Sequence, residues 1–405
     1  MPLDRLNTAL AAHVASLEEK GTAKGAETIV ESVDWPDKGH GPRFRLRGGG
    51  GRDYIRMNSN SYLGMGLRRD VVEAEEEATS AFGAGPGAVR FISGTYEPHV
   101  VLENRLAGFH GREAGMIFSS AYATVVSVLA PLTDDGTIVI SDELNHNCII
   151  NAMRLARPKE KVVYPHLDMD ALDAALARGA GARRAVIVTD GIFSMRGDHA
   201  PIDSIVEIAR RHDESYPENV VVIVDDSHGV GAFGETGRGT EEYTGGSSDV
   251  LIATLGKALG VNGGYIVSSE SVVRFLRESS PMYIYSNPIT VGEAAAALRA
   301  LEILDSGEGR RLLDRLRSLT KRFEKGLVDQ GFEIIAGEHP IVPLMVRDTA
   351  RTRALVAHLR DNGVLATGLA FPVVPRGDEE IRFQINADHT EADIDEVLEV
   401  LAAFG

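Results

Sequence analysis

The sequence predicts an α/β protein with a mostly parallel sheet in a large domain and a smaller α+β domain after it. The first observation is a series of short β-branched runs between about residues 115 and 270, separated by stretches of helical pattern. The second is that these runs are apolar throughout instead of alternating, which is typical of parallel strands buried on both faces. The runs are GMIFSS, GTIVISD, RAVIVTDG, VVVIVDDSH, DVLIATLGK and GGYIVSS.

The composition excludes several classes of protein. The 405 residues include 42 basic and 59 acidic side chains, a formal net charge of −17, whereas nucleic-acid and anionic-membrane surfaces need clustered Lys and Arg. The single cysteine, Cys148, excludes an internal disulfide and a multi-cysteine zinc site. No apolar run reaches the length of a membrane span, and the N-terminus lacks the pattern of a secretory signal. We therefore expect a cytoplasmic enzyme with no nucleic-acid, membrane or metal partner.

The N-terminal segment differs from the central pattern. Its apolar residues recur every three or four positions, which predicts an amphipathic helix that packs on the body of the protein or on a partner subunit. Residues 41–57 predict two short strands around a Gly-rich turn. The helix pattern rests on Leu3, Leu6, Leu10, Val14 and Leu17.

The C-terminal part shows a third pattern. After about residue 290 a long helical stretch leads to strands at FEIIAG, IVPLMVRD and EIRFQINAD, and Thr390 with Asp393 predicts a capped final helix. We expect three domains: an arm with helix and hairpin over 1–55, a large ligand-binding domain over 56–290, and a small C-terminal domain over 291–405.

Polar side chains stand where the predicted strands end. The carboxyl ends of parallel strands meet at one edge of an open α/β sheet, where such folds bind ligands. A polar residue at one strand end is common because the chain there enters water, but several consecutive units share the feature here. The ends carry Ser119, Ser120, Asp190, Asp225, Asp226, Ser227, His228, Thr254 and, just beyond it, Lys257.

Lys257 and Asp225 suggest a cofactor chemistry. A lysine just past a buried strand, between glycines, reaches back over the sheet edge and suits a Schiff-base role. A carboxylate at Asp225 would keep a pyridine nitrogen protonated, which makes pyridoxal phosphate an electron sink. Two other interpretations stay open at this point: a solvated loop lysine, and a metal site built from Asp225, Asp226 and His228.

The segment SSAYATVVSVL predicts an anion site, because it follows a strand and opens a helix whose free N–H groups face the ligand. His146, just past another strand, would stack on an aromatic cofactor, although a structural histidine is the common alternative. Gly83, Gly85 and Ala88 match a dinucleotide fingerprint, but a helical pattern precedes them where that motif needs a strand.

These motifs together resemble a known family. From about residue 55 onward the chain is similar to the α-oxoamine synthases among the fold-type I pyridoxal-phosphate enzymes, and most similar to their 2-amino-3-ketobutyrate CoA ligase (glycine C-acetyltransferase) members. The resemblance rests on SNSYLGMG, VRFISGT, SDELNHNCIINAMRLA, TDGIFSMRGD, VDDSHGVGAFGETGRG, TLGKALG, FPVVPRG and NADHT.

The resemblance implies a role for each matching residue. Lys257 would bind the cofactor, pyridoxal 5′-phosphate, and move the Cα proton of the substrate. Asp225 would pair with the pyridine nitrogen, His228 with the phenolic oxygen of the ring, and His146 would stack on it. These four are the expected catalytic residues.

Further positions would hold the cofactor. The resemblance places the backbone of Ala121 and Tyr122 and the Thr254 hydroxyl on the phosphate, and Ser194 near the ring and substrate. Ser286 would reach the phosphate bound by a partner subunit, which implies a homodimer with the active site at the interface.

The activity implied is the condensation of glycine or another small amino acid with an acyl-CoA to a 2-amino-3-oxo product, with or without decarboxylation. Arg382 and Asn60 would bind the amino-acid carboxylate. Ala123 and Val125 differ from the ligase pattern, so a different amino acid or acyl donor stays open. An aminotransferase or an aldol or retro-aldol lyase of the same fold is the alternative, and a catalytically silent protein is disfavoured because Lys257 is present.

Overall fold

The computed structural model describes residues 3–37, 39–371 and 373–404. Contacts divide them into two compact units. The first unit combines residues 1–59, 318–337 and 341–405, and the second combines residues 60–317 and 338–340. Contacts thus group the chain differently from the three consecutive segments predicted above, and the division into an arm, a cofactor-binding domain and a C-terminal domain stays a prediction.

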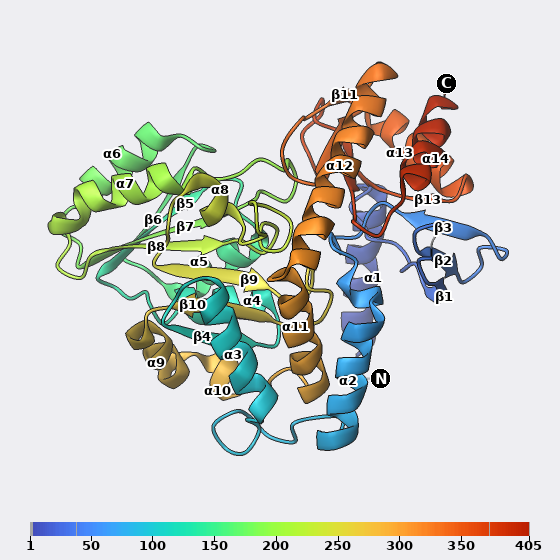
Figure 1. Cartoon of the computed structure of the whole chain (residues 1–405). Coiled ribbons are helices and arrows are strands. Elements are labelled where there is room, and N and C mark those ends of the chain that lie inside the picture. The colour runs from blue at the N-terminus through green and yellow to red at the C-terminus, as the bar shows by residue number, and fades with distance from the viewer. Residues whose placement is uncertain (1–2, 38, 372, 405) are drawn as a thin grey trace. The chain divides into compact units, whose positions relative to one another are not determined.

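A seven-stranded sheet forms the centre of the second unit (Figure 1). Six of its strands run parallel and only β10 runs antiparallel to its two neighbours, so the predicted mostly parallel sheet is confirmed. In spatial order the strands are β4 (Ala114–Phe118), β10 (Gly264–Ser268), β9 (Val250–Thr254), β8 (Val220–Asp225), β7 (Arg184–Asp190), β5 (Thr137–Asp142) and β6 (Glu160–Tyr164). All but the edge strand β6 match the runs predicted from sequence.

Helices lie on both sides of this sheet (Figure 1). The inner strands β5, β7 and β8 are almost wholly buried, which explains their continuous apolar runs. In chain order the helices are η1 (Met65–Leu67), α2 (Arg69–Phe82), α3 (Glu97–Phe109), α4 (Ala121–Leu129), α5 (Asn147–Ala156), α6 (Met169–Gly179), α7 (Ile202–His212), η2 (Asp213–Ser215), α8 (Thr240–Thr244), α9 (Glu270–Ser279), α10 (Pro281–Ile284) and α11 (Val291–Leu304).

The helix α11 explains why the contact-based boundary differs from residue 290. Its buried face packs against α2 and α3, so the chain stays in the second unit well beyond the predicted boundary. The next helix, α12 (Gly307–Asp329), contains the point, after Arg317, where the chain passes from one unit to the other.

The first unit is α+β. One of its four-stranded sheets has the order β1 (Val30–Asp34), β2 (Arg43–Leu46), β3 (Asp53–Arg56) and β13 (Val364–Leu365); the other has the order β11 (Glu333–Ile334), β12 (Ile341–Met345), β15 (Glu380–Gln384) and β14 (Thr367–Leu369). The hairpin predicted over 41–57 is β2 and β3, paired antiparallel. Its helices besides the shared α12 are α1 (Asp4–Glu19), α13 (Thr349–Asp361) and α14 (Glu391–Ala402).

The predicted terminal helices are both present, with different surroundings. In α14, the Thr390 hydroxyl accepts the Asp393 N–H while the Asp393 side chain accepts the Thr390 N–H, which is the predicted reciprocal cap. Helix α1 buries none of its residues within this chain, and Leu6 and Leu10 are about half exposed. Its packing on a partner subunit stays a prediction.

Candidate functional site

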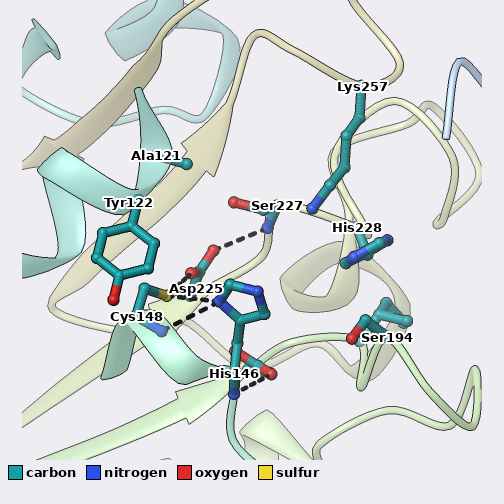
Figure 2. Close-up of a pocket in the computed structure, with 11 residues that line it drawn as sticks. Ala121, Tyr122, His146, Cys148, Ser194, Asp225, Ser227, His228 and Lys257 are labelled. Atoms are coloured by element: carbon teal, nitrogen blue, oxygen red, sulfur yellow. Dashed lines mark hydrogen bonds between the residues drawn. The ribbon is translucent and has the colours of Figure 1, made fainter. Parts of the chain in front are cut away.

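A cavity lies at the carboxyl ends of the parallel strands in the second unit (Figure 2). Several lining residues, among them Asp190, Asp225 and Lys257, stand at strand ends or in the turns that follow them, as expected for an open α/β sheet. The structure brings together seven of the residues predicted from sequence. The lining consists of Ala121, Tyr122, His146, Cys148, Asp190, Ile192, Ser194, Asp225, Ser227, His228 and Lys257.

Lys257 enters the cavity from the turn between β9 and β10. The turn is closed by hydrogen bonds from Leu255 N–H to the Gly263 carbonyl and from Val261 N–H to the Leu255 carbonyl, both 3.0 Å. Figure 2 shows the Lys257 side chain extending from this turn toward Ser227 and His228. The turn therefore aims an amine at the centre of the site.

Asp225, the last residue of β8, is buried at the floor of the cavity. Its Oδ1 accepts the Ser227 N–H at 3.1 Å, and its Oδ2 lies 3.6 Å from the Cys148 sulfur (Figure 2). These bonds leave the carboxylate fixed in direction, with acceptor capacity for one more donor. A carboxylate held in this way suits a protonated ring nitrogen.

Asp190 stands beside Asp225, because the two are paired residues on the neighbouring strands β7 and β8. Burial raises the pKa of Asp190 well above its usual value, and the negative charge of Asp225 raises it further. Its Oδ2 accepts the backbone N–H of His146 at 2.9 Å. Asp190 thereby ties the start of helix α5 to the strand end.

His146 is the N-cap of α5, and its Nδ1 accepts the Cys148 N–H at 3.2 Å. Burial lowers the pKa of His146, and the charge of Lys257 lowers it further while Asp225 opposes this. The imidazole is therefore neutral near pH 7. Because Nδ1 is the acceptor, the ring proton lies on Nε2. A neutral ring held by its own helix cap is well placed to cover a flat ligand.

His228 is held from behind by two buried residues that the sequence reasoning missed. The Tyr62 hydroxyl lies 2.7 Å from His228 Nδ1, and the His339 Nε2 donates to the His228 carbonyl at 2.8 Å. The Tyr62 and His339 rings also meet edge to face, with centroids 5.3 Å apart. These contacts fix the His228 side chain, which lines the cavity.

The amino end of α4 forms the anion side of the site. Ser120 caps the helix by accepting the Ala123 N–H at 3.1 Å, so the N–H groups of Ala121 and Tyr122 have no acceptor within the helix. A Cβ at Gly264 would come within 2.4 Å of the Ala121 nitrogen, so only glycine lets β10 pass this close. The positive helix end and these two donors suit a phosphate group.

The donor set fits pyridoxal 5′-phosphate. It offers an amine for an aldehyde, a fixed carboxylate for a pyridine nitrogen, a neutral imidazole for a ring face and a helix end for a phosphate. One buried polar atom supports a ligand here: Ser227 Oγ has no hydrogen-bond partner among the residues that the structure describes. A buried hydroxyl in that state is costly unless a ligand completes its bonding.

The other predicted site residues lie outside this lining. Thr254 ends β9, where its hydroxyl donates to the Gly263 carbonyl at 3.1 Å. Ser286 follows α10 and is partly exposed, and Asn60 lies 3.4 Å from the Tyr62 hydroxyl through its Oδ1. Arg382 is a half-buried residue of β15 in the first unit. Their predicted contacts with phosphate and substrate stay predictions.

One departure noted in the sequence has a structural explanation of its own. Val125 is buried in the core beneath the sheet with Met116 and Ile266, so its apolar character serves packing.

The metal interpretation is not supported, because both oxygens of Asp226 accept hydrogen bonds from Thr240, at 2.6 and 2.7 Å. Within the described residues, no group of three or more acidic, histidine or cysteine side chains is arranged to hold a metal ion.

Comparison with known proteins assigns the family. The sequence profile of the aminotransferase class I and II family matches residues 52–401. The chain belongs to this family. The match spans the whole of the seven-stranded sheet and all residues that line the cavity.

Two relatives have the same name and cover most of the chain. The 8-amino-7-oxononanoate synthase of Symbiobacterium thermophilum is 40% identical over 358 residues, which are 88% of this chain and 89% of that protein. The 8-amino-7-oxononanoate synthase of Geobacter sulfurreducens is 35% identical over 402 residues, which are 99% of this chain and 98% of that protein.

Among solved structures, a variant of serine palmitoyltransferase from S. paucimobilis with a bound PLP–myriocin aldimine superposes with a TM-score of 0.87. It is 27% identical, and the match covers 100% of this chain and 97% of that one. The relatives and this structure are α-oxoamine synthases, so the protein is a pyridoxal-phosphate-dependent acyltransferase of that type. The predicted family and cofactor are confirmed; the finer resemblance to glycine C-acetyltransferase is not what these relatives indicate.

No helix in the described part of the chain combines the length and the apolar character needed to cross a membrane.

The residues that line the cavity but were not predicted as site residues have weak signals in the sequence. Asp190 and Ser227 stand at predicted strand ends, whereas Cys148 and Ile192 carry no sequence pattern that points to a ligand.

Proposed function

We propose that the protein condenses a small α-amino acid, with alanine as the first candidate, with an acyl thioester. The supporting observation is that one cavity joins the Lys257 amine, the buried Asp225 carboxylate, the neutral His146 ring and the amino end of α4. An aminotransferase could use the same parts, but the relatives that match nearly the full chain are acyltransferases. The product is a 2-amino-3-oxo compound.

Five residues of the cavity have a task in such a reaction. The cofactor supplies an electron sink for the negative charge that forms at the substrate Cα. The Lys257 Nζ takes the Cα proton and returns it later. Asp225 holds a proton on the pyridine nitrogen, and the N–H groups of Ala121 and Tyr122 hold the phosphate. His146 covers one ring face and excludes water from it.

The bonds of the overall reaction balance without a further reactant. The substrate Cα forms a bond to the thioester carbonyl carbon, the C–S bond breaks, and the thiol leaves with a proton. Where the product is decarboxylated, the bond between Cα and the carboxylate breaks, CO2 leaves, and a proton takes its place. No oxidant or reductant is required.

The name of the relatives' product suggests the substrates. In 8-amino-7-oxononanoate, the carbon that bears the amine also bears a methyl group, as in alanine after loss of its carboxylate. The remaining seven carbons, from the ketone to the terminal carboxylate, correspond to the acyl part of a seven-carbon dicarboxylic monothioester. We infer that this pair is the first to test. Glycine with a short acyl-CoA, the expectation from sequence, is the comparison pair.

Two further parts of the proposal concern residues outside the cavity lining. Arg382 and Asn60 are proposed to bind the amino-acid carboxylate.

A homodimer is proposed because Phe91, Ile92 and Tyr285 expose 66, 69 and 81% of their surfaces in this chain, a cost that a second copy would remove. Ser286 is the neighbour of Tyr285 and would reach the site of the second copy. Sedimentation of the purified chain as a monomer would contradict the dimer.

The test is release of free thiol from a matrix of amino acids and acyl-CoAs, with products identified by mass. Glycine, alanine and serine are paired with acetyl-, pimeloyl- and palmitoyl-CoA. We expect the fastest release with alanine and pimeloyl-CoA. Turnover of the amino acid without a thioester would instead indicate an aminotransferase or a lyase, and no thiol release from any pair would contradict the proposal.

A further inference from the structure

The loop over residues 191–200, which follows β7, brings Ile192 and Ser194 to the wall of the cavity. Its base is closed by a hydrogen bond from Ala200 N–H to the Gly191 carbonyl at 2.9 Å. Its tip is closed by a bond from Phe193 N–H to the Asp198 carbonyl, also 2.9 Å. These bonds fix the shape of the loop, but its place over the cavity needs contacts with other elements.

His166, between β6 and α6, provides such a contact. Its Nδ1 lies 3.0 Å from Asp142 Oδ1 at the end of β5, and its Nε2 lies 3.1 Å from Asp198 Oδ2 in the loop. The Phe193 ring stands edge-on to the imidazole, with centroids 4.4 Å apart. Because both ring nitrogens face carboxylate oxygens, both must donate, and the ring carries a positive charge.

The backbone around His166 is built to keep this bridge. Asp142 is buried, and its two oxygens also accept the N–H groups of Leu144 and Leu167, each at 2.9 Å. Leu167 adopts a left-handed conformation with φ of 57°, which costs about 1 kcal/mol for an L-residue. Local strain at Leu167 is therefore offset by the bonds to Asp142. The Asp142 side of the bridge is rigid as a result, and the bridge therefore positions the loop over 191–200.

Charged groups from two segments, the end of β5 and the loop over 191–200, surround the His166 bridge. Asp142 and Asp198 flank the ring, the Glu143 side chain accepts the His166 N–H at 2.9 Å, and the Arg196 Nε donates to Asp198 Oδ2 at 3.1 Å. Burial lowers the pKa of His166, but hydrogen bonds and charges of Asp142 and Asp198 outweigh this and raise the pKa to about 9. The bridge is thus intact at neutral pH.

We propose that His166 is a positioning residue of the active site. As a cation shared between Asp142 and Asp198, it fixes the loop over 191–200 against the cavity and thereby holds Ser194 beside the bound cofactor. The proposal rests on the proposed function, because it needs pyridoxal phosphate in the cavity. It assigns a role in cofactor binding to a residue outside the cavity lining.

The test compares the full chain with His166→Gln and Asp198→Asn, which each remove one member of the bridge. The control is His212→Gln, because His212 Nε2 makes a single ion pair at 3.0 Å, with Asp173, between α7 and α6. We measure the Kd of pyridoxal phosphate by the visible circular dichroism of the bound cofactor, and hydrogen–deuterium exchange of the 191–200 peptide in the cofactor-free protein at pH 7. Thermal unfolding shows whether each variant is folded.

We expect Kd to rise about tenfold in His166→Gln and Asp198→Asn, and loop exchange to accelerate in both. The double variant should differ little from either single one, because both break the same bridge. A histidine with a raised pKa stabilises the loop at low pH and loses that effect as pH rises through about 9. The wild type should therefore bind more weakly above pH 9, whereas His166→Gln should be weak already at pH 7.

The outcomes separate the two proposals. Unchanged Kd, loop exchange and pH profile in folded His166→Gln and Asp198→Asn would overturn the positioning role. If one of these two variants unfolds, the Kd and loop exchange of the other variant test the positioning role. No cofactor binding by the wild type would instead contradict the proposed function.

Discussion

The two edges of the central sheet treat carboxylates in opposite ways. At the amino edge, Glu218 accepts hydrogen bonds from Arg183 and Arg184 at 2.9 and 2.6 Å, and these arginines lower the pKa of its carboxyl. At the carboxyl edge, burial raises the pKa of Asp190 and that of Asp226, the latter to about 7. The same strands thus carry paired arginines and a carboxylate at one edge of the sheet and buried aspartates at the other.

This difference indicates the role of the buried aspartates at the carboxyl edge. Arginines would neutralise the carboxylates and leave nothing for a ligand, as at the amino edge. At the carboxyl edge the hydrogen bonds come from backbone N–H groups and a hydroxyl instead: His146 to Asp190, Ser227 to Asp225 and Thr240 to Asp226. Of these groups, Asp190 and Asp225 line the cavity, and they favour a cationic ligand group, such as a protonated pyridine nitrogen, next to the Lys257 amine.

The largest expected effect is at Lys257. Lys257→Ala removes the amine that faces the acidic floor, so thiol release should fall by at least about 10³-fold, because proton transfer and covalent attachment of the cofactor are lost together. Lys161→Ala, on the exposed edge strand β6, is the control and should keep its activity. Thiol release near the wild-type rate in Lys257→Ala would contradict the assigned role.

The second effect is at Asp225. Asp225→Asn keeps the shape of the side chain but removes the charge that holds a proton on the ring nitrogen, so we expect kcat to fall about 10²-fold while cofactor still binds. The visible absorption maximum of the bound cofactor should shift with it. An unchanged spectrum and kcat would show that the floor does not act on the cofactor.

The third prediction concerns stability and sharpens the contrast between the edges. Burial raises the pKa of Asp226 in the folded state to about 7, so its contribution to stability is present below pH 4 and is lost as pH rises to about 7. The effect is on the order of a few kcal/mol. Denaturant unfolding at several pH values should show this slope in the wild type and a flatter one in Asp226→Asn. Identical slopes would mean that Asp226 is not the group responsible.

The smallest effect is at the amino edge. Glu218 is partly exposed and its ion pairs are screened by solvent, so Glu218→Gln should shift Tm by less than about 2 °C and leave thiol release unchanged. What little it changes should appear at neutral pH and vanish in acid, because a carboxyl with a lowered pKa loses its contribution as pH falls. A large loss of activity would mean that the two edges are not independent.

Much of the fold could be predicted because its signals are local. The buried strands are continuous apolar runs, and their polar ends identify the edge that holds Asp225, His228 and Lys257. The sequence does not predict the edge strand β6, because three of its five residues are exposed and only Val162 and Tyr164 are partly or fully buried. A strand that is covered on one side lacks the apolar run that identified the others.

The parts that could not be predicted depend on contacts between distant residues. Tyr62 and His339 meet at His228 although all three are far apart in sequence, and no motif links them. His166 likewise joins Asp142 and Asp198 from a separate segment. Such residues are visible only once the chain is folded, because their chemistry lies in what they touch and not in their spacing.

The most direct test of the account is to locate the cofactor on the chain. Purified protein is incubated with pyridoxal phosphate, reduced with borohydride and digested, and the modified peptide is identified by mass. The account predicts one phosphopyridoxyl group on the peptide that contains Lys257, and none on that peptide in Lys257→Ala. No adduct, or an adduct chiefly on another lysine, would contradict the assignment of this cavity as the active site.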